Sequence, residues 1–439
     1  MAFRRTLGPF DATMVVIGGI IGTGIFVNPY IVARTLDSSP QVIAAWVAGG
    51  LVAIAGAFAY AELGRQQPQA GGPYVYLRDA WHPVVGFLYG WALLLMIEAG
   101  GMAAVALNFA RYALRLVGQP ESGMTVVAIG AITGLTVINY IGVRPGSRVL
   151  NVLVVLKLGA LAVLIVFAWW GTAATDWWSA ARTSAAPSGL LAFGAALIPI
   201  LFAYGGWQKA NYVAEEMRDP ERHLPRSLVI GTLVVIAVYV LANIAYLRTL
   251  GLAGLAGTET PAASVAGLWL GAAGARFISA TIAISTFGFL DLAILASPRV
   301  YYAMAADGAF LPALGRLHPR FQTPTTAILL QSAWAIALLV TGKYEDLLNT
   351  VVFADWIFFG LTVAGLFILR RRFAGRSGFR TPGYPWLPAA FVLVAIVVVL
   401  SVIRTAPLRS AVGAALLALG VPVYYWFKRG AQATDSTSQ

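Results

Sequence analysis

The chain is organised as long apolar blocks separated by short polar and charged stretches. Most blocks are close to the ~20 residues that a helix needs to cross the hydrocarbon core of a bilayer. They lack the alternating pattern of barrel strands, so helices are favoured. The pattern predicts an all-α membrane protein with twelve transmembrane helices. The twelve blocks are residues 12–36, 41–64, 83–116, 123–142, 149–171, 190–217, 227–249, 268–304, 324–341, 347–369, 386–404 and 409–427.

Composition supports this prediction and excludes other classes. Of the 439 residues, 59% are hydrophobic and only 11% are charged, whereas soluble domains carry about 25% charged residues. A soluble enzyme, a nucleic-acid binder and a disordered protein are therefore excluded. The chain has no cysteine, so it cannot form a disulfide with a partner subunit, and its three histidines lie in separate loops. Neither a metal site nor a cofactor is expected.

The distribution of positive charge predicts the orientation. With the N-terminus placed inside, 19 of the 30 Lys and Arg residues lie on the inner side, 9 on the outer side and two within apolar blocks. Positive residues are enriched in cytoplasmic loops. We therefore expect a multi-pass protein of the cytoplasmic (inner) membrane with both termini in the cytoplasm, and the net charge of +12 reflects topology rather than nucleic-acid binding.

Two blocks contain a sequence that is poorly suited to a continuous helix. The first block has four glycines between Gly18 and Gly24, and the sixth has Pro199 followed by Gly205 and Gly206. Each glycine costs about 1 kcal/mol relative to alanine in a helix. Small residues also serve close helix packing, but two such sites at corresponding places favour a pair of broken helices.

Each break opens a run of five predicted helices, so the second run enters the membrane from the opposite side. Paired interruptions of this kind in an inverted repeat indicate the central site of a transporter. The predicted organisation is a cytoplasmic N-terminus, a first repeat (helices 1–5), a second repeat (helices 6–10), two further helices and a cytoplasmic tail. These parts correspond to residues 1–11, 12–171, 190–370, 386–427 and 428–439.

The breaks also predict the chemistry of the site. A half-helix that begins near Thr23 presents free N–H groups and a positive dipole end to an anion. Half-helices that end near Ile20 and Phe202 present free carbonyl groups to a cation. Donors and acceptors so close together fit a small zwitterion or an anion, and an α-amino acid is one such molecule.

The two breaks carry a resemblance to a known family. The segment Gly18–Phe26, GGIIGTGIF, resembles the first-helix signature of the amino acid–polyamine–organocation superfamily. The segment Phe202–Trp207, FAYGGW, with the following Glu215-Glu216, is similar to the L-amino-acid transporter branch, here as a bacterial-type stand-alone member. The resemblance implies a leucine-transporter-type fold, with a 5+5 inverted repeat, helices 1 and 6 broken and two C-terminal helices.

The resemblance also implies the substrate-binding residues. Main-chain N–H groups of Thr23 and Gly24 would hold the carboxylate of the substrate. Carbonyl groups of Ile20, Phe202 and Gly205 would hold its amino group, and the Phe202 ring would close over it. The full set of expected substrate-binding residues is Ile20, Gly22, Thr23, Gly24, Ile25, Phe202, Ala203 and Gly205.

Charged residues inside the apolar blocks are candidates for ion coupling, because they are costly in a membrane. By resemblance, Lys157 in the fifth block, with Ser285 in the eighth, replaces a bound sodium ion; a proton-carrying role for Lys157 is the competing interpretation. Glu98 and Asp291 are possible proton sites or members of polar networks between helices.

Further acidic residues lie near the predicted cytoplasmic ends of the blocks. We expect Glu62 and Glu215-Glu216 to pair with Arg78 or Arg218 in an inner gate, with Lys209 in the same network.

These observations predict a secondary transporter of neutral L-amino acids that works by sodium-independent exchange or facilitated diffusion. A proton-coupled symporter is the alternative, and an ion channel is a more distant one, because a filter is usually built by a ring of subunits. An enzyme is not expected, since no catalytic pair lies at membrane depth. The expected partners are the amino acid and the bilayer, without a disulfide-linked heavy chain, and the chain is expected to be a monomer or a weak homodimer.

Overall fold

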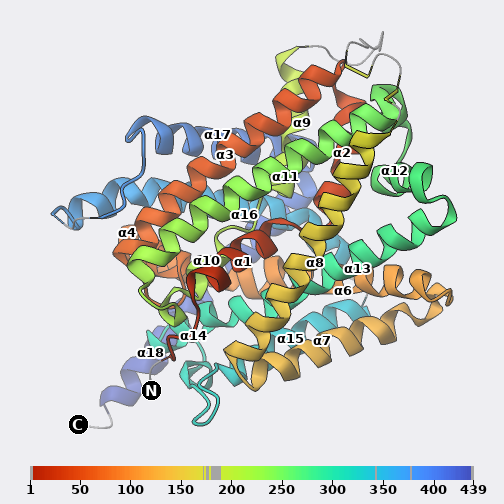
Figure 1. The fold of residues 1–439 in the computed structure, drawn as a ribbon. Coiled ribbons are helices and arrows are strands. Elements are labelled where there is room, and N and C mark those ends of the chain that lie inside the picture. Colours follow the sequence, from red (N-terminus) through yellow and green to blue (C-terminus); the bar gives the residue numbers. More distant parts are fainter. Residues whose placement is uncertain are drawn as a thin grey trace.

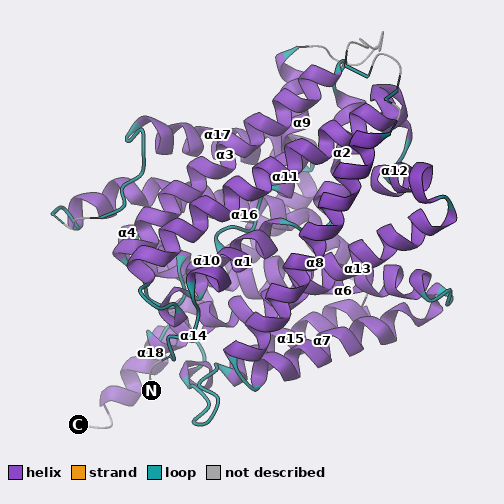
Figure 2. Ribbon diagram, in the orientation of Figure 1, coloured by secondary structure: helices purple, strands orange, loops and turns teal. Residues whose placement is uncertain are grey.

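The computed structural model describes residues 3–171, 173–174, 177–178, 189–341, 344–375 and 378–436. Helices make up most of the described chain (Figure 2). Strand-like pairing among the described residues is limited to an isolated bridge between Leu7 and Met217. The helices of the first half are α1 (Pro9–Ile20), α2 (Gly24–Thr35), α3 (Ser39–Gln66), α4 (Pro73–Ala80), α5 (Pro83–Ala92), η1 (Leu93–Ile97), α6 (Glu98–Leu116), η2 (Glu121–Gly123), α7 (Met124–Tyr140) and α8 (Val143–Trp170).

The second half continues in the same way. Its helices are α9 (Leu190–Ala203), α10 (Lys209–Tyr212), η3 (Ala214–Glu216), α11 (Pro220–Gly257), α12 (Pro261–Leu270), α13 (Ala272–Ala296), α14 (Pro298–Ala306), η4 (Pro312–Gly315), α15 (Thr325–Thr341), α16 (Tyr344–Arg372), α17 (Trp386–Thr405) and α18 (Pro407–Ser436). Two short helices, α4 and α12, lie outside the predicted set, and α18 extends beyond its predicted end at residue 427.

The prediction of a multi-span helical membrane protein is confirmed. Among the described residues, nine helices are long and apolar enough to cross a membrane, and the bent pair α1–α2 makes a tenth. The helices that correspond to the sixth and ninth predicted spans, α9 and α15, are apolar but shorter. The count of twelve therefore stays a prediction.

The helices pack into one bundle in which α1 lies against α8 and α11, while α3 and α11 run side by side (Figure 1). The marked ends of the chain lie toward the same end of the bundle (Figure 1). At that end Leu7 and its neighbour Thr6 donate their N–H groups to the carbonyl of Glu216, and the Leu7 carbonyl accepts the N–H of Arg218. The N-terminal segment is thereby held against the segment that follows α10.

The first interruption is a true break. The chain bends by 41° between α1 and α2, and α1 starts at Pro9, slightly before the predicted residue 12. The second interruption follows α9, where Tyr204 to Gln208 form turns before α10 begins. Pro199 inside α9 adds to the local weakness, and its carbonyl accepts a hydrogen bond from the Asn28 side chain of α2 at 2.7 Å.

Glycine allows the two breaks to touch. A Cβ atom placed on Gly206 would lie 2.0 Å from the carbonyl oxygen of Gly19, and one placed on Gly24 would lie 2.8 Å from the Cβ of Ala203. Gly206 also has a φ of +115°, which residues with side chains rarely adopt. The glycines that weaken both helices are therefore the ones that let the two broken backbones meet.

The ion pairs that Glu62 and Glu216 form differ from the pairs expected for the inner gate. Glu62 pairs with Arg370 at 3.1 Å, and Glu216 pairs with Arg299 at 2.7 Å, both acidic side chains being fully buried. The expected partner Arg78 instead pairs with Asp79 and Asp307. The sequence showed the acidic and basic residues but not the three-dimensional order of the helices, which selects the partners.

Candidate substrate site at the two helix breaks

A cavity of about 150 Å³ lies where the two broken helices meet. Its wall is formed by the ends of α1, α2, α9 and α10, together with residues from η1, α6, α13 and α16. Seven of the eight predicted substrate-binding residues line it: Ile20, Gly22, Thr23, Gly24, Phe202, Ala203 and Gly205. The eighth, Ile25, is fully buried and lies outside the lining.

The start of α2 offers free hydrogen-bond donors to this cavity. Thr23 is the N-terminal cap of α2, and its side chain makes no capping hydrogen bond. Within the described chain, the main-chain N–H groups of Thr23 and Gly24 have no protein acceptor. Such groups at a helix N-terminus, reinforced by the helix dipole, suit an anion such as a carboxylate.

The carbonyl groups at the ends of α1 and α9 are less free than the sequence predicts. The Ile20 carbonyl accepts the N–H of Gly22 at 2.9 Å and the hydroxyl of Tyr239 at 3.1 Å. The Tyr239 hydroxyl also lies 3.2 Å from the carbonyl oxygen of Ala203. The Phe202 carbonyl accepts the N–H of Gly205, while the Gly205 carbonyl has no donor among the described residues.

Tyr239 therefore ties the two broken helices together. It belongs to α11 and is fully buried, and its single O–H group lies within reach of one carbonyl from each break. Sequence reasoning missed this residue, because a tyrosine within an apolar block carries no signal for such a role. Only the packing of α11 against α1 and α2 brings it there.

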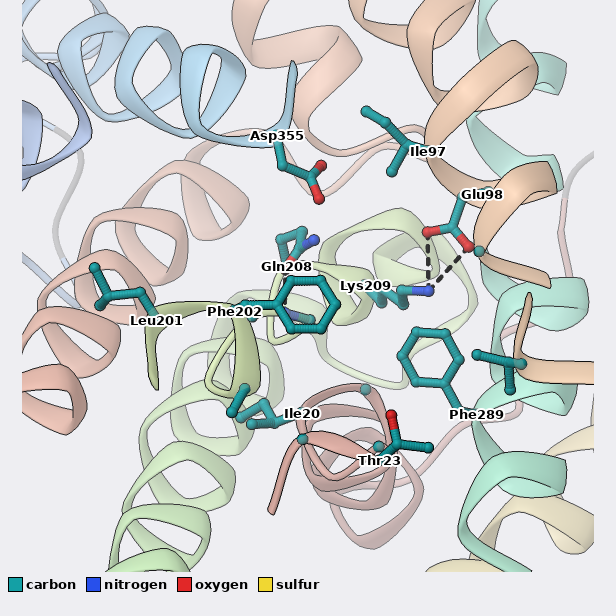
Figure 3. Close-up of a pocket in the computed structure, with 18 of the residues that line it drawn as sticks. Ile20, Thr23, Ile97, Glu98, Leu201, Phe202, Gln208, Lys209, Phe289 and Asp355 are labelled. Carbon is teal, nitrogen blue, oxygen red and sulfur yellow. Dashed lines mark hydrogen bonds and ion pairs between the residues drawn. The ribbon is translucent and has the colours of Figure 1, made fainter. Parts of the chain in front are cut away.

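The Phe202 ring lies over the cavity (Figure 3). Phe202 is 51% exposed, whereas its neighbours Leu201 and Ala203 are each only 4% exposed. Because the residue lies at the end of α9 rather than on the outer surface of a loop, the exposed area faces the cavity. The ring therefore borders the space that a bound molecule would occupy.

Lys157 lies on the opposite side of the first break. It is fully buried, and its ammonium group donates to the carbonyl oxygens of Ile21 at 2.6 Å and Gly18 at 3.2 Å. The hydroxyl of Ser285 lies 3.3 Å from the Ile21 carbonyl and 3.2 Å from the Gly22 carbonyl. The two residues that the sequence grouped together thus meet at the same carbonyl groups.

The two candidate proton sites are separated by the fold. Glu98 lines the cavity and forms a buried ion pair with Lys209, with oxygen–nitrogen distances of 2.8 and 2.9 Å. Asp291 is not part of the lining and accepts a hydrogen bond from Asn139 at 2.7 Å. The expectation that Lys209 joins the inner network is wrong, since the turn after α9 directs it into the cavity wall.

One further charged lining residue, Asp355 of α16, was not identified from the sequence. It is an acidic residue inside a largely apolar block, and the general rule that intramembrane charges are functional candidates could have found it. Its position opposite the helix breaks depends on the packing of α16, which the sequence does not reveal (Figure 3).

Two discontinuous helices that meet around a central cavity are the arrangement found at the substrate site of many membrane transporters. The chain belongs to the amino acid permease family, whose model matches residues 7–426. This assignment agrees with the superfamily indicated by the sequence motifs, and it makes the protein a transporter rather than an enzyme.

Individual relatives cover almost the whole chain. The serine/threonine exchanger SteT of Bacillus subtilis is 33% identical over 430 residues, which is 97% of both chains. The human large neutral amino acids transporter small subunit 2 is 31% identical and covers 97% of this chain and 81% of its own. The human b(0,+)-type amino acid transporter 1 is 29% identical, with coverage of 97% and 88%.

Proposed function

We propose that this protein exchanges neutral L-amino acids by alternating access, without sodium. The observation that carries the proposal is the pair of N–H groups at Thr23 and Gly24, which have no acceptor among the described residues and belong to residues that line a cavity of about 150 Å³ where two broken helices meet. The substrate carboxylate binds these donors. The amino group of the substrate binds carbonyl oxygens in the turn that follows α9, where the Gly205 carbonyl has no donor among the described residues.

The contacts of Lys157 support sodium independence. Its ammonium group occupies the position beside the Gly18 and Ile21 carbonyls that a bound cation would otherwise take. A permanently attached cation stabilises the end of α1 without an ion gradient. Lys157 and Ser285 thus act as a built-in replacement for sodium.

The names of the relatives agree with this proposal, since one is an exchanger of serine and threonine and another a transporter of large neutral amino acids. Residues 12–171 and 190–370 form the two inverted repeats, each opened by one break. The protein lies in the cytoplasmic membrane with both termini on the cytoplasmic side, where most of its Lys and Arg residues are found.

The carrier acts alone or as a weak homodimer. One relative is named as a small subunit, but a disulfide to a heavy chain would need a cysteine, and the sequence has none. Chemical crosslinking of the purified protein in lipid nanodiscs tests the oligomeric state.

Uptake into proteoliposomes tests the proposed activity. Vesicles that contain the purified protein are loaded with unlabelled alanine or left empty, and the uptake of labelled alanine, serine and leucine is measured in sodium-free buffer. Exchange predicts several-fold faster uptake into the loaded vesicles. Equal uptake into loaded and empty vesicles contradicts exchange, and a requirement for sodium contradicts the role of Lys157.

The same vesicles address proton symport, which is favoured by the acidic side chains in the cavity wall. Uptake into empty vesicles is measured with and without an imposed inward proton gradient. An exchanger shows no accumulation that depends on the proton gradient. If the gradient drives accumulation and internal amino acid does not stimulate uptake, the protein is a proton symporter rather than an exchanger.

A further inference from the structure

Three charged side chains from different helices meet in the wall of the cavity. Glu98 comes from α6, Lys209 from α10 and Asp355 from α16 (Figure 3). The surrounding wall includes the apolar side chains of Phe289 and Trp356. Charges are costly in such an environment unless each one has a partner.

Two of the three charges neutralise each other. The Lys209 ammonium lies 2.8 and 2.9 Å from the two carboxylate oxygens of Glu98, and both side chains are about 5% exposed. The same ammonium lies 4.3 Å from the centre of the Phe289 ring, which adds a cation–π contact. The contact partners of the Lys209 ammonium are therefore Glu98 and the Phe289 ring.

Asp355 is the remaining charge. Its neighbours in the helix, Ala354 and Trp356, are buried, whereas Asp355 is partly accessible and lines the cavity. Figure 3 shows its carboxylate directed into the open space. In the part of the chain that the structure describes, this carboxylate has no hydrogen bond or ion pair.

The other buried lysine does not supply the missing charge. Lys157 lies behind the first break and outside the cavity lining, and its ammonium is bound to the Gly18 and Ile21 carbonyls. The three charged side chains of the wall thus sum to one negative charge, and a cation inside the cavity would lie close enough to balance it.

We propose that Asp355 is a specificity-determining residue that binds a positively charged side chain of the substrate, so that the exchanged amino acids include cationic ones. The inference rests on the proposed function, since the head group must be held at Thr23 and Gly24. In the view of Figure 3, Asp355 lies across the cavity from Thr23. A substrate anchored at the start of α2 therefore extends its side chain toward this carboxylate.

Two amino acids of equal size test the proposal directly. Ornithine and norleucine have side chains with the same number of heavy atoms, and they differ in a terminal ammonium in place of a methyl group. We expect ornithine to compete for labelled alanine exchange at a concentration at least about tenfold lower than norleucine, because its ammonium group forms a charge-assisted hydrogen bond with Asp355 and the methyl group of norleucine forms none. Equal competition, or stronger competition by norleucine, overturns the proposal.

A substitution at Asp355 tests whether this residue causes the preference for ornithine over norleucine. Asp355→Asn keeps the shape but removes the charge, and we expect it to reduce the preference for ornithine over norleucine by at least about tenfold. Asp37→Asn makes the same change in a residue ahead of α3 that does not line the cavity, and it should leave the preference unchanged. An unchanged ornithine preference in Asp355→Asn refutes the assignment.

If Asp355→Asn also loses alanine exchange, a binding measurement tests the role of Asp355. The ornithine and norleucine affinities of the purified variant are then measured by thermal stabilisation in detergent, and a retained preference counts against Asp355. The two proposals fail separately. Alanine exchange without competition by ornithine overturns only the role of Asp355, whereas the absence of exchange with any amino acid overturns the proposed function.

A proton that neutralises Asp355 is the competing explanation. It predicts that norleucine and ornithine compete equally and that uptake depends on an imposed proton gradient. That combination of results replaces the specificity role with a proton-carrying one.

Discussion

The two sides of the break between α1 and α2 are built from adjacent residues but have opposite properties. On the side of Lys157, the carbonyls of Gly18, Ile21 and Gly22 already receive donors from Lys157 and Ser285, both fully buried. On the cavity side, the N–H groups of Thr23 and Gly24 have no acceptor among the described residues.

This difference distinguishes main-chain groups that need a hydrogen-bond partner at all times from those that are left for a substrate. Unpaired main-chain groups are costly inside a membrane. The protein therefore satisfies one side with its own cation and leaves the other side to a ligand. Variants on the closed side should impair transport of every substrate, and variants on the open side should change binding.

The largest effect is expected for Lys157→Ala, on the closed side. It leaves buried carbonyls without their charged donor, and a loss of about 3 kcal/mol corresponds to a fall of roughly 100-fold in the exchange rate. The protein should still elute as a single species in size-exclusion chromatography. Exchange at the wild-type rate would remove Lys157 from the mechanism, and partial recovery with added sodium would support its role as an ion replacement.

A strong effect is also expected for Gly206→Ala, which disturbs the contact between the two breaks. The added Cβ would lie 2.0 Å from the Gly19 carbonyl oxygen in a backbone with positive φ. Strain of about 1–3 kcal/mol predicts a roughly tenfold or larger fall in exchange. Gly134→Ala is the control, because nothing lies within 4 Å of its added Cβ. Equal behaviour of the two variants would contradict the proposed contact.

A smaller effect is expected for Tyr239→Phe, at the boundary between the two sides. The change removes the hydroxyl that lies 3.1 Å from the Ile20 carbonyl and 3.2 Å from the Ala203 carbonyl. Loss of one hydrogen bond, about 1 kcal/mol, predicts a three- to tenfold rise in KM for alanine. A tighter KM would show instead that Tyr239 competes with the substrate amino group for these carbonyls.

The smallest effect is expected for Ser285→Ala. Its two contacts with the Ile21 and Gly22 carbonyls are long, and Lys157 remains bound to Ile21. We expect the exchange rate to fall by less than about threefold. A loss as large as that of Lys157→Ala would mean that the hydroxyl, rather than the ammonium, is essential for the closed side.

The sequence was most informative where composition and local chain stiffness decide the structure. Apolar blocks predicted a helical membrane protein, and the glycines between Gly18 and Gly24 predicted the break that the structure places between α1 and α2. The short helix α12, Pro261–Leu270, was missed because ten residues are too few for a membrane span and most of them lie between two predicted blocks.

The candidate site was predicted only in part. Motif residues such as Thr23 and Phe202 line the cavity as expected. Lys209 was assigned to the wrong network, and Asp355 and Tyr239 were not identified. These side chains come from separate helices, and their meeting depends on crossing angles and rotations that local sequence does not specify.

By itself, the sequence determined that the chain enters a membrane as helices and that two of these helices are interrupted, because hydropathy and glycine content act over short stretches of chain. Only the tertiary structure decided that the breaks touch, that Lys157 closes one side of the first break, and that the Asp355 carboxylate lines the cavity without a partner among the described residues. The reason is that electrostatic and hydrogen-bond partners are chosen by distance in space, and the bundle brings together residues that lie far apart in the sequence.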